Sequence, residues 1–272
     1  MQQYAATKVE HILEQGSGQR NEDYLVLDRD TYGVFDGATS LDGGCFEGGA
    51  SGGAMASSIA GKVFARNDRP LVRLAAEAND AIRDSMARCR VDVSRRCGLW
   101  STSAAVVRLT DDGIEWFRTG DAQIVFIDSD GSFTVAGGRD DHDDHDYPSL
   151  CMIKEKGRFH PDVQDIIRTV RLGMNRDYGV LNGEREAEDF FLSGVKPACG
   201  VRTALLFTDG LDIPYETPQR RKDYSHLVDL ARATGLYGLR DRVRGLESLD
   251  PDMERYPRFK RHDDMAAIAL HF

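Results

Sequence analysis

A strand-like run, a polar turn and a second strand-like run follow directly on one another in Tyr24-Leu25-Val26-Leu27-Asp28-Arg29-Asp30-Thr31-Tyr32-Gly33-Val34-Phe35-Asp36-Gly37. This spacing predicts a β-hairpin. The second run ends in Asp36, and no matching strand follows it at once. A carboxylate at the end of a core strand is costly unless a positive charge meets it. Asp36 is therefore a candidate for chemistry rather than only a turn residue.

Acidic residues also stand at the ends of other predicted strands. They are Glu22 and Asp23 before the hairpin, Asp209 after the apolar run 204–207, and Asp263 and Asp264 before the run 265–270. Strand ends are held on a rigid frame, so these acids can converge, and like charges brought together need a cation between them. The donors are oxygen atoms, which favours Mg²⁺ or Mn²⁺ over zinc, and a pair of such ions can activate water for attack on a phosphoryl group.

The alternative is that these acids are scattered turn residues, because Asp and Gly both favour turns. Asp112-Gly113 and Asp130-Gly131 lie between strand patterns in polar surroundings, and we expect them to be hairpin tips. Spacing alone leaves both interpretations of the other acids open.

The remaining pattern predicts an α+β fold. Helical spacing of apolar residues covers 50–66, 71–86, 162–172, 224–234 and 239–249. Strand patterns at 103–107, 114–117, 124–127 and 132–135 predict an antiparallel meander, and further strands are expected near 190–192, 204–207 and 265–270. Strands and helices come in blocks, which argues against a doubly wound parallel sheet. Because no repeat or linker interrupts the chain, we expect residues 1–272 to form a single domain.

Composition excludes several classes of protein. The chain has 272 residues and a net charge of −10, which disfavours nucleic acid and anionic membranes as partners. No stretch reaches the ~20 apolar residues of a membrane helix, and no secretory signal begins the sequence, so we expect a cytoplasmic location. The 5 cysteines include no close pair, which argues against zinc and disulfides.

Six motifs together resemble those of the metal-dependent (PPM, type 2C) protein serine/threonine phosphatases. In order they are Arg20-Asn21-Glu22-Asp23, Val34-Phe35-Asp36-Gly37, Ser101-Thr102-Ser103-Ala104-Ala105, Thr119-Gly120-Asp121-Ala122, Leu206-Phe207-Thr208-Asp209-Gly210-Leu211 and His262-Asp263-Asp264-Met265-Ala266. The resemblance spans nearly the whole chain. It implies a four-layer α-β-β-α sandwich of two antiparallel sheets flanked by helices.

The resemblance also implies roles for the acids. Asp36 would bridge two Mn²⁺ or Mg²⁺ ions, with Asp209 and Asp263 completing the first site. Glu22 and the Gly37 carbonyl would hold the second ion, directly or through water, and Asp23, in the same motif, would belong to the metal site as an acid that supports these ligands. Asp121 takes the place of the acid associated with a third, weaker ion. The implied nucleophile is a hydroxide bridging the ions, and the implied substrate is a phosphorylated serine or threonine of a protein, with a cognate kinase as a further partner.

The sequence departs from the family at three positions. Where the family commonly has Asp-Gly-His-Gly, this chain has Ala38 after Gly37, so the His proposed as general acid is missing. Without a positioned acid, worth ~10²–10⁴-fold, a serine alkoxide leaves poorly. The phosphate-binding Arg usually lies four residues before the Glu, a position held here by Gly18, and Arg20 is the nearby substitute candidate. Asp264 stands where the family usually has Asn. Two alternatives follow: a small-molecule phosphatase, or a pseudophosphatase that serves as a regulatory binding module.

Other polar segments have simpler explanations. The run 139–146 is rich in Asp and His, and we expect a solvated acidic loop rather than a metal site. His142, His145 and His262 are candidates to replace the missing proton donor. The basic runs 220–222 and 258–261 can steer phosphorylated substrates, although solubility explains them equally well.

Overall fold

The computed structural model describes residues 5–38, 41, 44–138 and 144–272, in which two antiparallel sheets of five strands pack face to face. The first sheet has the order β1 (Lys8–Glu14), β10 (Met265–His271), β9 (Val201–Phe207), β6 (Gln123–Asp128) and β7 (Phe133–Val135). The second has the order β2 (Tyr24–Asp28), β3 (Thr31–Ala38), β4 (Ser101–Thr110), β5 (Gly113–Thr119) and β8 (Leu192–Lys196).

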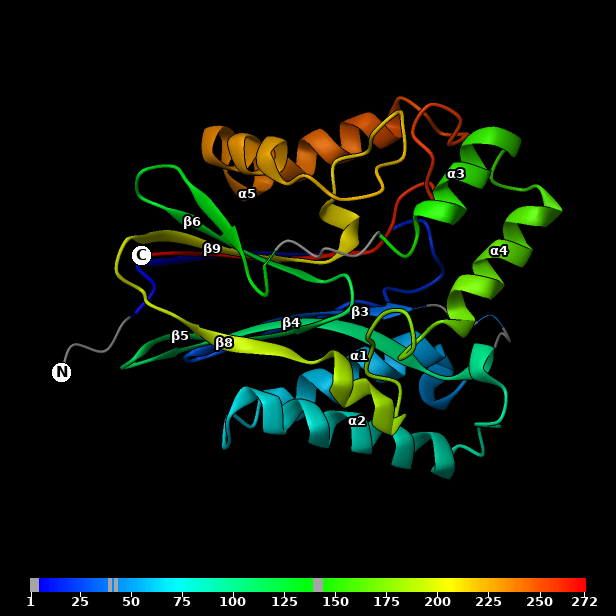
Figure 1. Cartoon of the computed structure of the whole chain (residues 1–272), viewed down its shortest axis with the longest axis horizontal. Helices are drawn as coiled ribbons and strands as arrows, with labels where there is room; N and C mark the ends of the chain where they lie inside the picture. The colour runs from blue at the N-terminus through cyan, green and yellow to red at the C-terminus, as the bar shows by residue number, and fades with distance from the viewer. Residues whose placement is uncertain (1–4, 39–40, 42–43, 139–143) are drawn as a thin grey trace.

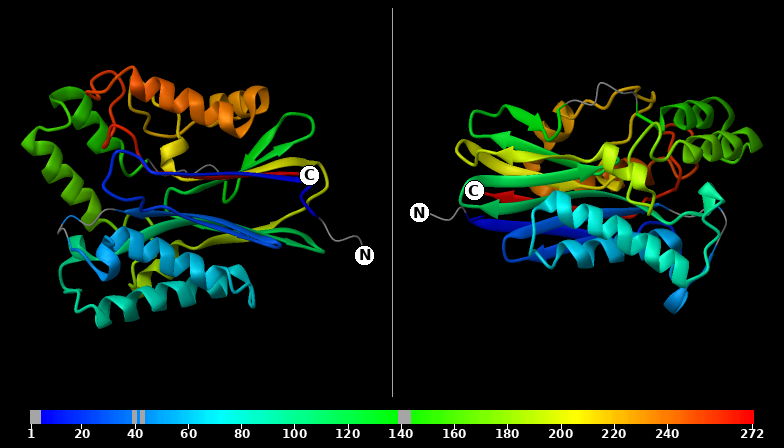
Figure 2. Two further views of the ribbon diagram at one scale, coloured as in Figure 1. Left: turned by 180° about the vertical axis from the view of Figure 1, so that it is seen from behind. Right: turned by 60° about the horizontal axis from the view of Figure 1, so that its bottom comes forward.

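Helices complete the α-β-β-α sandwich expected from the sequence (Figure 1). α5 (Ser225–Ser248) covers the outer face of the first sheet, and α1 (Gly52–Phe64) and α2 (Leu71–Arg88) cover the outer face of the second. α3 (Tyr147–Lys156) and α4 (Pro161–Leu172) lie at one end of the sandwich, opposite the C-terminus, as both views in Figure 2 also show. Short 3₁₀ helices are Glu47–Gly49, Arg96–Gly98, Arg185–Phe190 and Asp209–Leu211.

The central strands are buried on both faces, which explains their continuous apolar runs. In β4, Ala105 and Val107 pack between the sheets, whereas Ala104 and Val106 pack against the helices. This alternation follows from the two-residue period of a strand. The α2 residues predicted to form an apolar face, such as Leu74 and Ile82, are fully buried.

The hairpin of residues 24–37 is confirmed, with Leu25 opposite Val34 and Asp28 opposite Thr31. The predicted meander is wrong. β4 and β5 pair in one sheet and β6 and β7 in the other, so the chain crosses between sheets at Thr119–Ala122. Gly120 has a φ of 76° there, a conformation that favours glycine.

Other differences concern element boundaries. The two helices expected at 224–234 and 239–249 are found within α5, which the non-helical Gly235 (φ 72°, ψ −178°) divides into two helical segments. β8 begins where the strand near 190–192 was expected to end. β1 and α3 were not predicted; only Ile12 of β1 is buried, so this edge strand carries no apolar pattern. In the described part of the chain, no helix combines the length and apolar character needed to cross a bilayer.

Candidate functional site

The antiparallel register brings the acidic strand ends to one end of the sandwich. Asp36 of β3 lies opposite Ser103, near the start of β4. Asp209 follows β9, and Asp263 precedes β10, and these two strand ends are paired through Phe207 and Ala267. This is the end at which α3 and α4 lie (Figure 1). Residues separated by more than 200 positions in the sequence therefore meet at one place.

A cavity of ≈ 280 Å³ opens among these residues, and we call it the acidic cavity. Its lining includes Asp36, Gly37, Ala38, Ser103, Asp121, His145, Asp146, Ser149, Arg158, Arg171, Tyr178, Asp209, Phe259, Lys260 and Asp263. Four of the acids predicted from strand ends and motifs, Asp36, Asp121, Asp209 and Asp263, therefore share one cavity.

Burial and mutual repulsion shift the protonation of these acids. Burial raises the pKa of Asp36 well above its ordinary value, and the charges of Asp23, Asp121 and Asp263 raise it further. Burial likewise raises the pKa of Asp209, with Asp36 and Asp263 as the principal charged neighbours. The raised pKa values follow from burial first and from the neighbouring carboxylates second, and both effects disfavour the ionised forms of Asp36 and Asp209.

Three basic or polar neighbours partly compensate the charge of these acids. Lys260 Nζ donates a hydrogen bond of 2.7 Å to Asp263 Oδ1. Ser103 Oγ donates one of 2.6 Å to Asp121 Oδ1, and His145 Nε2 lies 3.7 Å from Asp121 Oδ2. Although burial alone would raise it, the pKa of Asp121 is lowered, chiefly by His145.

Asp23 and Glu22 lie behind the acidic cavity and do not line it. The buried Asp23 accepts a hydrogen bond of 2.7 Å from Thr208 Oγ1. Burial raises its pKa well above the ordinary value, and Asp209 and Asp263 add to the effect. The Glu22 carboxylate accepts a hydrogen bond from Ser51, which caps the N-terminus of α1.

Asp264, at the position where the family usually has Asn, organises the backbone beneath the site. Its Oδ1 accepts the Gly16 N–H at 2.8 Å, and its Oδ2 accepts the Glu22 N–H at 2.9 Å. The segment that carries Glu22 and Asp23 is thus tied to the segment that carries Asp263. Asp264 acts as an acceptor of backbone hydrogen bonds rather than as a lining residue of the acidic cavity.

Gly37 occupies a position with no room for a side chain. A Cβ there would lie 2.4 Å from the Glu22 carbonyl oxygen and 2.5 Å from that of Gly53. Gly37 therefore allows β3, the Glu22 segment and the start of α1 to approach closely. The next residue, Ala38, lines the acidic cavity where the family's histidine would stand.

The other predicted candidates are less central. Arg20 is exposed, and its Nη2 would lie 2.7 Å from a Cβ at Gly49, so the guanidinium rests against that turn outside the acidic cavity. His262 Nδ1 pairs with Glu247 at 2.8 Å, away from the acidic cavity. His142 and most of the acidic run, residues 139–143, lie outside the described residues. His145 does line the acidic cavity and stacks on Tyr178, with ring centroids 4.0 Å apart.

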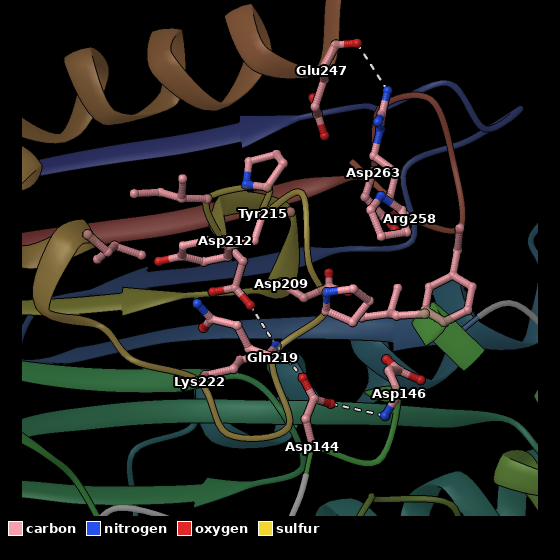
Figure 3. Close-up of a pocket in the computed structure, with 18 of the residues that line it drawn as sticks. Asp144, Asp146, Asp209, Asp212, Tyr215, Gln219, Lys222, Glu247, Arg258 and Asp263 are labelled. Carbon is pink, nitrogen blue, oxygen red and sulfur yellow. Dashed lines mark hydrogen bonds and ion pairs between the residues drawn. The ribbon is translucent and has the colours of Figure 1, made fainter. Parts of the chain in front are cut away.

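A second cavity of ≈ 160 Å³ adjoins the first across Asp209 and Asp263, beneath α5. Figure 3 shows Lys222 between Asp212 and Asp144, to which its Nζ lies at 2.6 Å and 3.6 Å. The apolar lining residues of this second cavity include Ile213, Tyr215 and Leu227. This second cavity thus offers both apolar and charged surface beside the acidic one.

The residues present fit divalent metal ions. The cluster consists of half-buried carboxylates, two of which, Asp36 and Asp209, have raised pKa values, and its donors are oxygen atoms, which Mg²⁺ and Mn²⁺ prefer. Among the described residues, Asp121, His145 and Asp146 also hold potential ligand atoms within 4.8 Å of one another. A bound cation would remove the repulsion that these acids otherwise impose on each other.

Sequence reasoning did not find several lining residues. Lys260 belongs to the basic run 258–261, for which the sequence leaves substrate steering and solubility open, and no sequence pattern marks Ser149, Arg158 or Tyr178. Ser149 and Arg158 belong to α3 and the turn after it, an element that was not predicted. A Lys three residues before Asp263 was the one local signal.

No family model matches this sequence, and no curated protein matches it. Solved structures do resemble the fold. The serine/threonine phosphatase PstP of Mycobacterium tuberculosis superposes with a TM-score of 0.59 at 15% identity, covering 97% of this chain and 98% of its own. Another structure, of the PstP catalytic domain in complex with 2 manganese ions, gives a TM-score of 0.58 at 15% identity and covers 97% of both chains.

Two further phosphatases give similar values. The PPM Ser-Thr phosphatase MsPP of Mycobacterium smegmatis has a TM-score of 0.58 at 17% identity, covering 99% of this chain and 100% of its own. Stp1 of Staphylococcus aureus has a TM-score of 0.59 at 14% identity, covering 100% of this chain and 97% of its own. At these identities the likeness establishes architecture, and this chain has the fold of the PPM-type serine/threonine phosphatases.

Proposed function

We propose that this protein is a metal-dependent phosphomonoester hydrolase that acts on phosphorylated serine or threonine of proteins. The observation that carries the proposal is the convergence of Asp36, Asp209 and Asp263 on one cavity at the end of a phosphatase-like sandwich. The raised pKa values of Asp36 and Asp209 support a site built for cations rather than a set of turn acids. The protein-phosphatase neighbours support the choice of substrate class.

We assign two ions, Mn²⁺ or Mg²⁺, to the acids. Asp36, Asp209 and Asp263 would hold one, and Asp36, Glu22 and the Gly37 carbonyl would hold the other, directly or through water. Asp23 would support this set through its bond to Thr208. Asp121, with His145 and Asp146 nearby, would hold a third. When bound, such ions supply an activated water and neutralise charge on the phosphoryl oxygens.

The chain's own residues position these groups. Thr208 orients Asp23, Ser103 orients Asp121, and Lys260 orients Asp263 through hydrogen bonds of 2.6–2.7 Å. The two Asp264 hydrogen bonds hold the Glu22 segment against the start of β10. The second cavity would receive residues that flank the phosphorylated side chain, which favours a peptide over a small molecule.

A pseudophosphatase is the second candidate, and Ala38 is the observation that favours it. An alanine lines the acidic cavity at the position of the family's proposed general acid. A protein without an acid for the leaving group would hydrolyse aryl phosphates more readily than phosphoserine, because an aryl oxide leaves without a proton.

Three further predictions belong to the hydrolase proposal: a cognate kinase as partner, a cytoplasmic location, and a single domain over residues 1–272.

Turnover of para-nitrophenyl phosphate with Mn²⁺ tests the activity. We expect metal-dependent turnover that falls by at least about 10²-fold in Asp36→Ala and Asp209→Ala. Asp112→Ala, at the exposed tip of the β4–β5 hairpin, is the matched control and should leave turnover unchanged. Absence of turnover in a protein that binds Mn²⁺ would favour the pseudophosphatase that serves as a binding module.

A second assay distinguishes protein from small-molecule substrates. It compares turnover of a phosphoserine peptide with that of a small phosphomonoester of equal leaving-group pKa.

A further inference from the structure

The proposed reaction needs cationic or hydrogen-bonding groups for the phosphoryl oxygens besides the metal ions. Gly18 stands where the family has its phosphate-binding arginine, and Arg20 rests against Gly49 outside the acidic cavity. A different part of the chain must supply the donor if phosphate binds here. The inference below therefore rests on the proposed function.

The basic side chains that line the acidic cavity differ in how they are engaged. Lys260 donates to Asp263 at 2.7 Å. Arg171 donates to Ser101 Oγ at 3.3 Å. Arg158 uses its Nε to donate to the Phe259 carbonyl oxygen at 2.7 Å, and no carboxylate of the described residues lies within ion-pair distance of it. Arg158 is thus held in place by one backbone bond and forms no ion pair with a described residue.

Two buried polar atoms of the acidic-cavity lining have no hydrogen-bond partner among the described residues. They are Nη1 of Arg158 and Oγ of Ser149, whose side chain is fully buried. Buried donors are nearly always satisfied, so an exception calls for an explanation. Ser149 lies in α3 and Arg158 in the turn after it, so one segment brings both unsatisfied donors to the acidic cavity.

We propose that Arg158 and Ser149 bind the non-bridging oxygens of the phosphoryl group. A guanidinium presents its N–H groups in a planar fork that matches phosphate, and a hydroxyl supplies a further donor. The two residues take over the task of the arginine absent at position 18. The bond from Arg158 to Phe259 fixes the guanidinium before the ligand arrives, which reduces the entropy lost on binding.

Calorimetric titration of the magnesium-loaded protein with inorganic phosphate tests this directly. We expect Arg158→Met to weaken phosphate binding by about tenfold or more and Ser149→Ala by about threefold, because each removes a donor to a charged ligand. Arg158→Lys keeps the charge but loses the fork, and its affinity should lie between wild type and Arg158→Met. Arg20→Met is the matched control and should stay within about twofold of wild type, because Arg20 lies outside the acidic cavity.

The outcomes separate this inference from the proposed function. Phosphate binding that depends on Arg158, in a protein without turnover, would support the inference while the hydrolase proposal fails. Turnover in a protein whose phosphate affinity is unchanged by Arg158→Met would overturn the inference alone. No phosphate binding by wild type also overturns it. Should Arg158→Met not fold, as judged by its thermal transition, Arg158→Lys and Ser149→Ala decide: affinity equal to wild type in both counts against the proposal.

Discussion

Lys260 Nζ lies 2.7 Å from Asp263 Oδ1, and this pair places a single lysine at the junction of the two cavities. Although burial opposes it, Asp263 raises the pKa of Lys260, with Asp264 and Asp36 contributing. The lysine therefore stays charged. Under the proposed function it would compete with a metal ion for the same carboxylate and would offer positive charge to a phosphoryl group.

Lys260→Met should tighten Mn²⁺ binding by about tenfold, because removing a cation a few ångströms from the acids strengthens their attraction for another. Equilibrium dialysis or calorimetry of the metal measures this. Arg261→Met, the same charge change at an exposed neighbouring residue, should have little effect. Weaker Mn²⁺ binding in Lys260→Met would instead mean that the lysine chiefly orients Asp263.

Asp209→Asn should abolish Mn²⁺-dependent turnover yet stabilise the metal-free protein by about 1–2 kcal/mol. The reason is that burial and the charges of Asp36 and Asp263 raise the pKa of Asp209, so its ionised form is unfavourable in the fold. Calorimetric unfolding in EDTA at pH 7.5 or so measures the gain. Asp112→Asn serves as control. A lower melting temperature for metal-free Asp209→Asn would contradict the repulsion described above.

Gly37→Ala should cost at least about 2 kcal/mol of stability, because its Cβ would lie 2.4 Å from the Glu22 carbonyl oxygen and 2.5 Å from that of Gly53. Both contacts are backbone, so no side-chain rotation relieves them. Urea unfolding of the metal-free protein measures the loss. Gly18→Ala, whose nearest contact is 3.5 Å, is the matched control and should be nearly neutral. An unchanged midpoint in Gly37→Ala would refute the packing argument.

Asp250→Asn should destabilise the protein by about 1–3 kcal/mol at pH 7, because its carboxylate accepts the Glu254, Arg255 and Tyr256 N–H groups and pairs with Arg258 at 2.9 Å. Although burial opposes it, these bonds lower the pKa of Asp250. A lowered folded-state pKa contributes stability above the unfolded value of ~3.9, and that stability is lost as pH falls through the folded pKa.

The difference between Asp250→Asn and wild type should therefore be largest near neutral pH and shrink below about pH 4. Thermal melts across this range provide the measurement. The exposed Asp252→Asn should follow wild type throughout. A gap that stays constant down to acid pH would show that the effect is not one of ionisation.

Local patterns predicted the elements whose information is short-range. The hairpin of residues 24–37 and the amphipathic helix α2 were readable because apolar period and turn residues are encoded within a few positions. The crossing between sheets at Gly120 could not be predicted from the sequence. β5 and β6 have the pattern of two neighbouring strands in a meander, and only the strands they pair with show that they belong to different sheets. The edge strand β1 was not predicted, because its single buried residue, Ile12, gives no alternation of apolar and polar residues.

For the acids too, part of the site could be predicted from the sequence and part could not. Asp36, Asp209 and Asp263 were found at strand ends from the sequence, and the register places these ends together. Their roles as ligands stay predictions. Arg158 and Ser149 could not be found in advance, because a lone arginine in a turn and a serine in a helix resemble many others. Their significance appears only when they line the acidic cavity with unsatisfied donors.

By itself, the amino-acid order predicted most of the segments that become strands, although not β1, and it placed oxygen-donor acids rather than thiols at their ends. Only the tertiary structure decided that β3 and β9 end where β10 begins, that Lys260 meets Asp263, and that the segment after α3 faces these acids. The physical reason is the distance along the chain over which each effect acts. Backbone preferences and apolar period act over a few residues, whereas charge repulsion, burial and unsatisfied donors depend on neighbours supplied by chain segments hundreds of positions apart.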